Sequence, residues 1–198
     1  MKKVKRDELL ELGAYEQIRE RFRAAVIEEK KHRRFQVSDE LSMVFENHTT
    51  VLFQIQEMLR TERITREAAI QHEIDTYNEL VPGAGELSAT LFVEIAEREV
   101  RERRLVELAG LEQTFALEID GESFPARNET RGVLPDRTTA VHYLKFPLAA
   151  AAVTRLVAAS RAGGVPPVVR MRVRHPNLEL ATAMPPAVVR SVSEDLSG

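Results

Sequence analysis

The sequence predicts an α+β protein in which N-terminal helices pack on a mostly antiparallel sheet. Apolar residues recur at helical spacing through the first 82 residues, and they alternate with period two in several short segments after the Pro/Gly-rich stretch 81–85. Helices followed by strands interleaved with helices are typical of this class. We expect a single domain over residues 1–184, with a helical first part (1–82) and a sheet-rich part (83–184). Pro185 and Pro186 open a stretch, 185–198, that we expect to be a mobile tail.

The first part contains three expected helices and one short strand. Residues 14–34 form a helix that ends in a basic run, where cations complement the helix dipole. A strand at 41–46 precedes Asn47, a good N-cap for a helix over 48–62. Thr65 is positioned to cap a further helix over 66–80. Because few residues link the last two helices, we expect an antiparallel hairpin.

The second part alternates strands and helices. A strand over 86–95 places leucine, alanine and valine on one face and polar residues on the other, and a charged helix over 97–109 ends at Gly110. Residues 113–119 and 122–127 form a hairpin through Asp120 and Gly121, with Pro125 at a sheet edge. A strand over 138–146, an alanine-rich helix over 148–161 closed by Gly163 and Gly164, and a strand over 168–174 follow.

Composition excludes several classes of protein. The chain has 28 basic and 31 acidic residues and a net charge of −3, which argues against a dedicated nucleic-acid binder. Arg170, Arg172 and Arg174 share one strand face, which we interpret as the solvent-exposed face of a sheet. RNA binding by these arginines is an alternative hypothesis. Without cysteine the chain has no disulfide, thiolate zinc site or cysteine nucleophile. No apolar run is long enough for a membrane span, so we expect a cytoplasmic protein without membrane contact.

Motifs for cofactors and catalysis are also missing. Glu29 and His32 form one ExxH unit, whereas di-iron sites in helical bundles use two such units and further carboxylates. The sequence contains no GxGxxG, Walker or GxSxG pattern. We therefore predict no cofactor, no metal and no catalytic residue.

The segment 45–62 is the most informative. At 100° per residue Val51, Ile55 and Leu59 share one apolar arc, while Phe53 lies on the opposite side among polar residues. Phenylalanine is unusual on a wet face, so we expect this second side also to meet protein. Enclosed polar groups need partners, which predicts a polar network of either structural or ligand-binding purpose, formed by Gln54, Gln56, Glu57 and Arg60.

Four segments carry a family resemblance: FENHTTVLFQIQEMLRTERI, YNELVPGAGELSATLFVEI, AVHYLKF and HPNL. Over about residues 5–180 the chain resembles a bacterial family catalogued as domain of unknown function 3501. The resemblance implies genes for rubrerythrin and for an iron–sulfur protein similar to heterodisulfide reductase nearby, and hence a role in peroxide defence or electron transfer. The positions that match the family's polar pattern, our ligand- or partner-binding candidates, are Glu46, Asn47, Gln54, Gln56, Glu57, Arg60, Glu86, Ser88, Thr90, Glu94 and His142, with Thr50 and Asn78 beside them.

Two functional hypotheses follow. The first is a non-catalytic accessory protein that docks onto a redox partner, such as rubrerythrin or the iron–sulfur protein. The second is a small-molecule or metal-dependent enzyme with a pocket between helix 48–62 and strand 86–95, in which Glu46, Glu57, Glu86, Glu94 and His142 supply ligands or an acid–base pair. Both require the polar sides of that helix and strand to converge. His142 shares a face with Leu144 and Phe146, so it is either a core histidine or a proton-transfer group. A homo-oligomer is compatible with either hypothesis.

Overall fold

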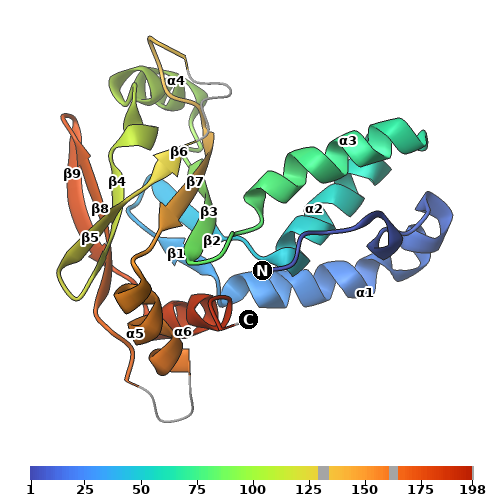
Figure 1. Ribbon diagram of the computed structural model, residues 1–198. Coiled ribbons are helices and arrows are strands. Elements are labelled where there is room, and N and C mark those ends of the chain that lie inside the picture. Colours follow the sequence, from blue (N-terminus) through green and yellow to red (C-terminus); the bar gives the residue numbers. More distant parts are fainter. Residues whose placement is uncertain (129–133, 161–164, 198) are drawn as a thin grey trace.

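Two antiparallel sheets pack face to face, and three N-terminal helices lie against the outer side of one of them (Figure 1). The computed structural model describes residues 1–128, 134–160 and 165–197. The five-stranded sheet has the order β1-β2-β3-β7-β6, and the four-stranded sheet has the order β5-β4-β8-β9. The strands of the first are β1 (Arg34–Gln36), β2 (Leu41–Phe45), β3 (Glu86–Val93), β7 (Val141–Pro147) and β6 (Arg127–Asn128); those of the second are β5 (Glu122–Pro125), β4 (Phe115–Ile119), β8 (Val169–His175) and β9 (Leu178–Ala183).

The helices divide into three groups. The N-terminal group contains α1 (Leu12–Lys31), α2 (His48–Thr61) and α3 (Glu67–Tyr77). Helix α4 (Arg98–Glu107) lies at one end of the sheets, and α5 (Ala150–Ser160) and α6 (Pro186–Glu194) lie together at the other end (Figure 1). Short 3-10 turns cover Arg6–Glu8, Asn78–Leu80 and Leu111–Gln113. The α+β class and the helices on an antiparallel sheet are confirmed.

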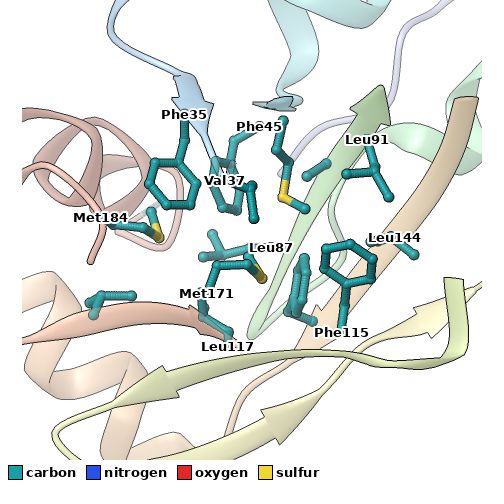
Figure 2. Close-up of a cluster of buried hydrophobic side chains, with 14 of the residues drawn as sticks. Phe35, Val37, Phe45, Leu87, Leu91, Phe115, Leu117, Leu144, Met171 and Met184 are labelled. Atoms are coloured by element: carbon teal, nitrogen blue, oxygen red, sulfur yellow. The ribbon is translucent and has the colours of Figure 1, made fainter. Parts of the chain in front are cut away.

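The larger core lies between the two sheets (Figure 2). Leu87 and Leu91 of β3 and Leu144 of β7 face Leu117 of β4 and Met171 of β8. Because side chains alternate along a strand, the intervening residues of β3 and β7 point toward the helices instead. The periodicity of β3 therefore supplies both this core and the polar face of the sheet.

A second core joins α2 and α3 to the N-terminal segment. Val51, Ile55 and Leu59 of α2 pack with Ile70 and Ile74 of α3, and Val4 and Leu9 cover them. The predicted apolar arc of α2 is thus buried on this side. The predicted hairpin of β4 and β5 also forms, with positive φ at both Asp120 (49°) and Gly121 (87°), and β5 is an edge strand as Pro125 indicates.

The structure differs from the sequence-based prediction in four places. The sheet is split in two, and strands β1 and β9 are additional. Residues 186–194, expected in a mobile tail, form α6: Pro186 suits a first helical position, and the valines at 188, 189 and 192 share one buried face. Helix α1 ends at Lys31, so Arg33 leaves the basic run and is buried. Gly163 and Gly164, expected to close the alanine-rich helix, lie outside the described residues.

Candidate functional site

A buried carboxylate, Glu46, lies where β2 meets α2. Its side chain is 3% exposed. Oε1 accepts a hydrogen bond from the Thr90 hydroxyl (2.5 Å), and Oε2 accepts from the Thr50 hydroxyl (2.5 Å) and from Gln54 Nε2 (3.0 Å). Three donors from two elements give hydrogen bonds to a carboxyl group that would be costly to bury without partners. The structure therefore brings Glu46, Gln54 and Thr90 together between α2 and β3.

Asn47 caps α2, as the sequence predicts. Its Oδ1 accepts from the Thr50 N–H (2.9 Å), while its own N–H donates to Thr50 Oγ1 (2.9 Å). Nδ2 also donates to Glu29 Oε1 of α1 (2.7 Å). Glu29, the acid of the ExxH unit, thus ties α1 to the start of α2.

The buried Arg33 binds the main chain at the end of β2, next to Glu46. Its Nε donates to the Phe45 carbonyl (2.9 Å) and its Nη2 to the Glu46 carbonyl (3.3 Å), and the guanidinium also pairs with Asp195 next to α6. Burial raises the pKa of Asp195, an effect that Arg33 opposes. Arg33 was not among the predicted residues, because one more cation in a basic run carries no sign of burial.

Three predicted residues of α2 face α1 and the N-terminal segment instead of β3. Glu57 accepts from the Tyr15 hydroxyl (2.7 Å) and from Arg19 Nε (2.8 Å) and Nη2 (2.7 Å). The hydrogen bond from Arg19 lowers the pKa of Glu57; Tyr15 adds to this effect, and partial burial opposes it. Burial raises the pKa of Tyr15. Arg60 pairs with a glutamate of α1, and Gln56 binds the main chain of residue 10.

Phe53 confirms that the second side of α2 also meets protein. Its ring packs edge-on against Phe22 of α1 at 5.6 Å between centroids, and Lys30 Nζ lies 5.9 Å from its centroid. An aromatic side chain in a polar arc was therefore a valid sign of a two-sided helix.

A groove of about 270 Å³ runs along α2. It is lined by Lys30 of α1, by Tyr77 of α3, by the C-cap Glu62 and by α2 itself, whose lining residues are Phe53, Gln54, Glu57, Met58 and Thr61. Gln54 connects this groove to the Glu46 network, because its amide donates to Glu46. Burial, followed by the neighbouring Tyr143 and Glu73, raises the pKa of Tyr77.

Beside the groove, the helix-facing side of the five-stranded sheet carries exposed apolar side chains. Val141 and Tyr143 of β7 are 41% and 36% exposed. They lie opposite Phe92 and Thr90 of β3, and cross-strand partners share a face. Thr90 belongs to the Glu46 network, so polar network, groove and apolar strand face adjoin.

The side chains of the other predicted residues, Glu86 and Ser88 of β3 and Glu94 just after it, take no part in the network. Glu86 accepts from the Gly83 N–H (2.8 Å) and from Lys145 Nζ (2.9 Å). Burial favours a higher pKa for Glu86, but these two donors lower it. Ser88 is buried, and its carbonyl accepts from the Glu46 N–H (2.8 Å). Glu94 is half exposed and pairs weakly with Arg34 (3.4 Å).

His142 lies on the opposite side of the five-stranded sheet. It pairs in register with Leu91 and is buried toward the space between the sheets. Its Nε2 lies 2.7 Å from the Thr138 hydroxyl, which donates to Glu112 at 3.4 Å. Burial lowers the pKa of His142, and Glu112 opposes this. The expected pocket that combines His142 with Glu46, Glu57, Glu86 and Glu94 is therefore not formed, because alternation along β7 turns the imidazole inward.

Two further sets of residues have structural partners. His175 Nε2 lies 3.0 Å from the Ala109 carbonyl, and Asn177 Nδ2 donates to the Glu107 carbonyl (2.7 Å), so the HPNL segment caps the end of α4. On β8, Arg170 and Arg172 both pair with Glu118 of β4. Their shared acid reduces the positive charge of this strand face.

Two general features concern ligands and membranes. In the described parts of the chain, no three histidine, aspartate or glutamate side chains are arranged to hold a metal ion. Within the same residues, every helix is too short or too polar to cross a bilayer.

Comparison with known proteins identifies relatives over the whole chain. A family profile described as "Protein of unknown function (DUF3501)" matches residues 3–196. A crystal structure of a protein of unknown function from Burkholderia pseudomallei K96243 is similar at a TM-score of 0.90, with 34% sequence identity over 99% of this chain and 100% of the other. No curated protein matches. The chain therefore belongs to the DUF3501 family.

Proposed function

We propose that the protein is a non-catalytic accessory protein that binds a partner protein through its groove and the adjoining strand face. The observation that carries the proposal is an exposed apolar strand face that adjoins the groove: Tyr143 neighbours Tyr77 of the groove, and Val141 lies two residues before Tyr143 on the same face of β7. Aromatic and aliphatic side chains gathered at one exposed site are typical of interaction surfaces. The partner proposed first is a redox protein, either rubrerythrin or the iron–sulfur protein that the resemblance implies.

The placement of the carboxylates supports a structural role for them. Glu46 and Glu57 each use both oxygens to accept hydrogen bonds from other parts of the fold. A general acid or base must instead reach a proton of the substrate. The carboxylate pocket of the enzyme alternative also lacks His142, which lies behind the sheet. Glu46 keeps α2 against the sheet, and Glu57 keeps α2 against α1.

The experiment measures binding of purified rubrerythrin and of the purified iron–sulfur protein, both from the same genome, by calorimetry. Val141→Asp introduces a charge into the proposed surface and should weaken binding by at least about tenfold. The matched control is Val106→Asp, because Val106 is an exposed valine of α4 away from the groove. Binding by neither protein, or equal affinities for both variants, would contradict the proposal.

A further inference from the structure

Two buried side-chain amides hold the N-terminal segment by its main chain. The Val4 N–H donates to Asn78 Oδ1 (2.8 Å), and Asn78 Nδ2 donates back to the Val4 carbonyl (2.8 Å). At the other end the Leu10 N–H donates to Gln56 Oε1 (2.9 Å), and Gln56 Nε2 donates to the Leu10 carbonyl (3.0 Å). Each amide thus pairs with one residue's N–H and C=O, as a neighbouring strand would, and selects a backbone rather than a particular side chain.

Between these two clamps, only a few side chains enter the fold. Val4 and Leu9 are buried on α2 and α3, against Ile55 and Ile74. Most of the other side chains point outward: Lys2, Lys3, Lys5, Asp7 and Leu10 are exposed. Figure 1 shows the segment running along the helices toward the start of α1. Its attachment is that of a bound peptide with two buried apolar anchors, and the partly buried Met1 packs on the same cluster.

Charged contacts at the rim add a preference for particular side chains. Arg6 Nε pairs with Glu67 of α3 (2.8 Å), and Glu8 lies 2.9 Å from His48 of α2. The helical surface therefore fits a segment with an apolar residue, a basic residue two positions later and a second apolar residue three positions after that.

We propose that this surface of α2 and α3 is a peptide-binding site, that residues 1–10 occupy it as a built-in ligand, and that a segment of a partner protein with the same chemistry displaces them. The proposal rests on the proposed function for the existence of a partner, but it concerns a different side of α2. The partner segment is expected to share the features of residues 1–10. It needs two apolar anchors, one basic residue, and main-chain N–H and C=O groups available to pair with Asn78 and Gln56. Because α2 and α3 also pack directly on each other, local release of residues 1–10 leaves the contact between the two helices in place.

The test uses the full chain and a fluorescent peptide with the sequence of residues 1–11. Val4→Asp places a charge in an apolar site and should release the segment, so that the labelled peptide binds this variant saturably. Wild type, with its site filled, should bind at least about tenfold more weakly. The matched control is Leu10→Asp, because the Leu10 side chain is 39% exposed and does not anchor the segment. Adding Asn78→Ala to Val4→Asp removes one clamp on the main chain and should weaken peptide binding by at least about tenfold.

Hydrogen exchange on wild type provides a second measurement that does not depend on a variant folding. The amides of Val4 and Leu10 should exchange at least about a hundredfold faster than those of Ile70 and Ile74, through local release of the segment. Equal rates at all four positions, or the absence of saturable peptide binding to a folded Val4→Asp protein, would overturn the proposal. Neither result depends on Val141, so failure here is distinguishable from failure of the groove to bind a redox partner.

Discussion

At the scale of single residues, the fold depends on a few buried polar groups with complete sets of partners. Glu46 unites α2 and β3 through three donors, and Arg33 fixes the main chain of the same segment. Neither group is free for chemistry in this arrangement. Their loss should therefore appear first as lost stability.

Glu46→Ala should lower the free energy of unfolding by about 2–4 kcal/mol, because it leaves the hydroxyls of Thr50 and Thr90 and the amide of Gln54 without their acceptor. Urea unfolding followed by circular dichroism measures the change. Glu94→Ala is the matched control, with an expected change within about 0.5 kcal/mol because Glu94 is half exposed. Similar values for the two variants would show that the network does not stabilise the fold.

His142 should make stability depend on pH near neutrality. Burial lowers its pKa in the folded state below the ordinary value of 6.5, so below about pH 6.5 the unfolded chain binds more protons than the folded one. Stability from this group is complete above that pH and falls as the pH is lowered toward the folded pKa. Unfolding in urea at pH 7.5 and 5.5 should show a smaller loss for His142→Gln than for wild type. Equal losses would contradict this prediction, because they would show that folding does not lower the pKa of His142.

The sequence predicted some of these residues and missed others for identifiable reasons. Asn47 was recognisable because an N-cap has a local signature, and His142 because its neighbours in the strand are apolar. Arg33 and Glu112 were not, since their burial depends on partners distant in the sequence, Asp195 and Thr138. The expectation that helix and strand share a polar network holds for Glu46, Gln54 and Thr90, while Glu57 and Arg60 bind α1.

At the scale of elements, α2 is the central helix because it contacts other parts of the chain on three sides. One side packs on α3 and the N-terminal segment, a second packs on α1, and a third carries Thr50 and Gln54 toward the sheet. The sequence showed the first side as an apolar arc and the second as a lone aromatic. It could not show that Gln56 and Glu57 turn away from the sheet, because a helical wheel gives directions but not neighbours.

The contact of α1 with α2 predicts coupling between Phe22 and Phe53. Each change to alanine should destabilise the protein by about 2–3 kcal/mol, somewhat less than a fully buried phenylalanine, because both rings are half-buried. The double variant should lose about 0.5–1.5 kcal/mol less stability than the sum of the two single variants, because either single change already removes the edge-on ring contact. The control is Ile27→Ala, at an exposed apolar position of α1. Strict additivity of Phe22→Ala and Phe53→Ala would contradict the packing described.

At the scale of the whole molecule, two sheets enclose the larger core and α6 closes one end of it. The sequence predicted most of the strands, but neither β1 and β9 nor the division between two sheets, because period two shows which residues point inward and not which strands are neighbours. Helix α6 was missed because a proline pair was interpreted as the start of a tail. The core takes up the apolar side of β3, which leaves its polar side for the helices, and the exposed residues of β7 beside it for the partner that we propose.

The most direct test of partner binding at this face is hydrogen exchange of the protein alone and in complex with the purified rubrerythrin or iron–sulfur protein. We predict that binding slows exchange in β7 at residues 141–143 and in α2 at residues 53–58 and leaves exchange in α4 unchanged. Protection confined to α4 or to the outer face of β8, or no protection at saturating partner, would contradict it.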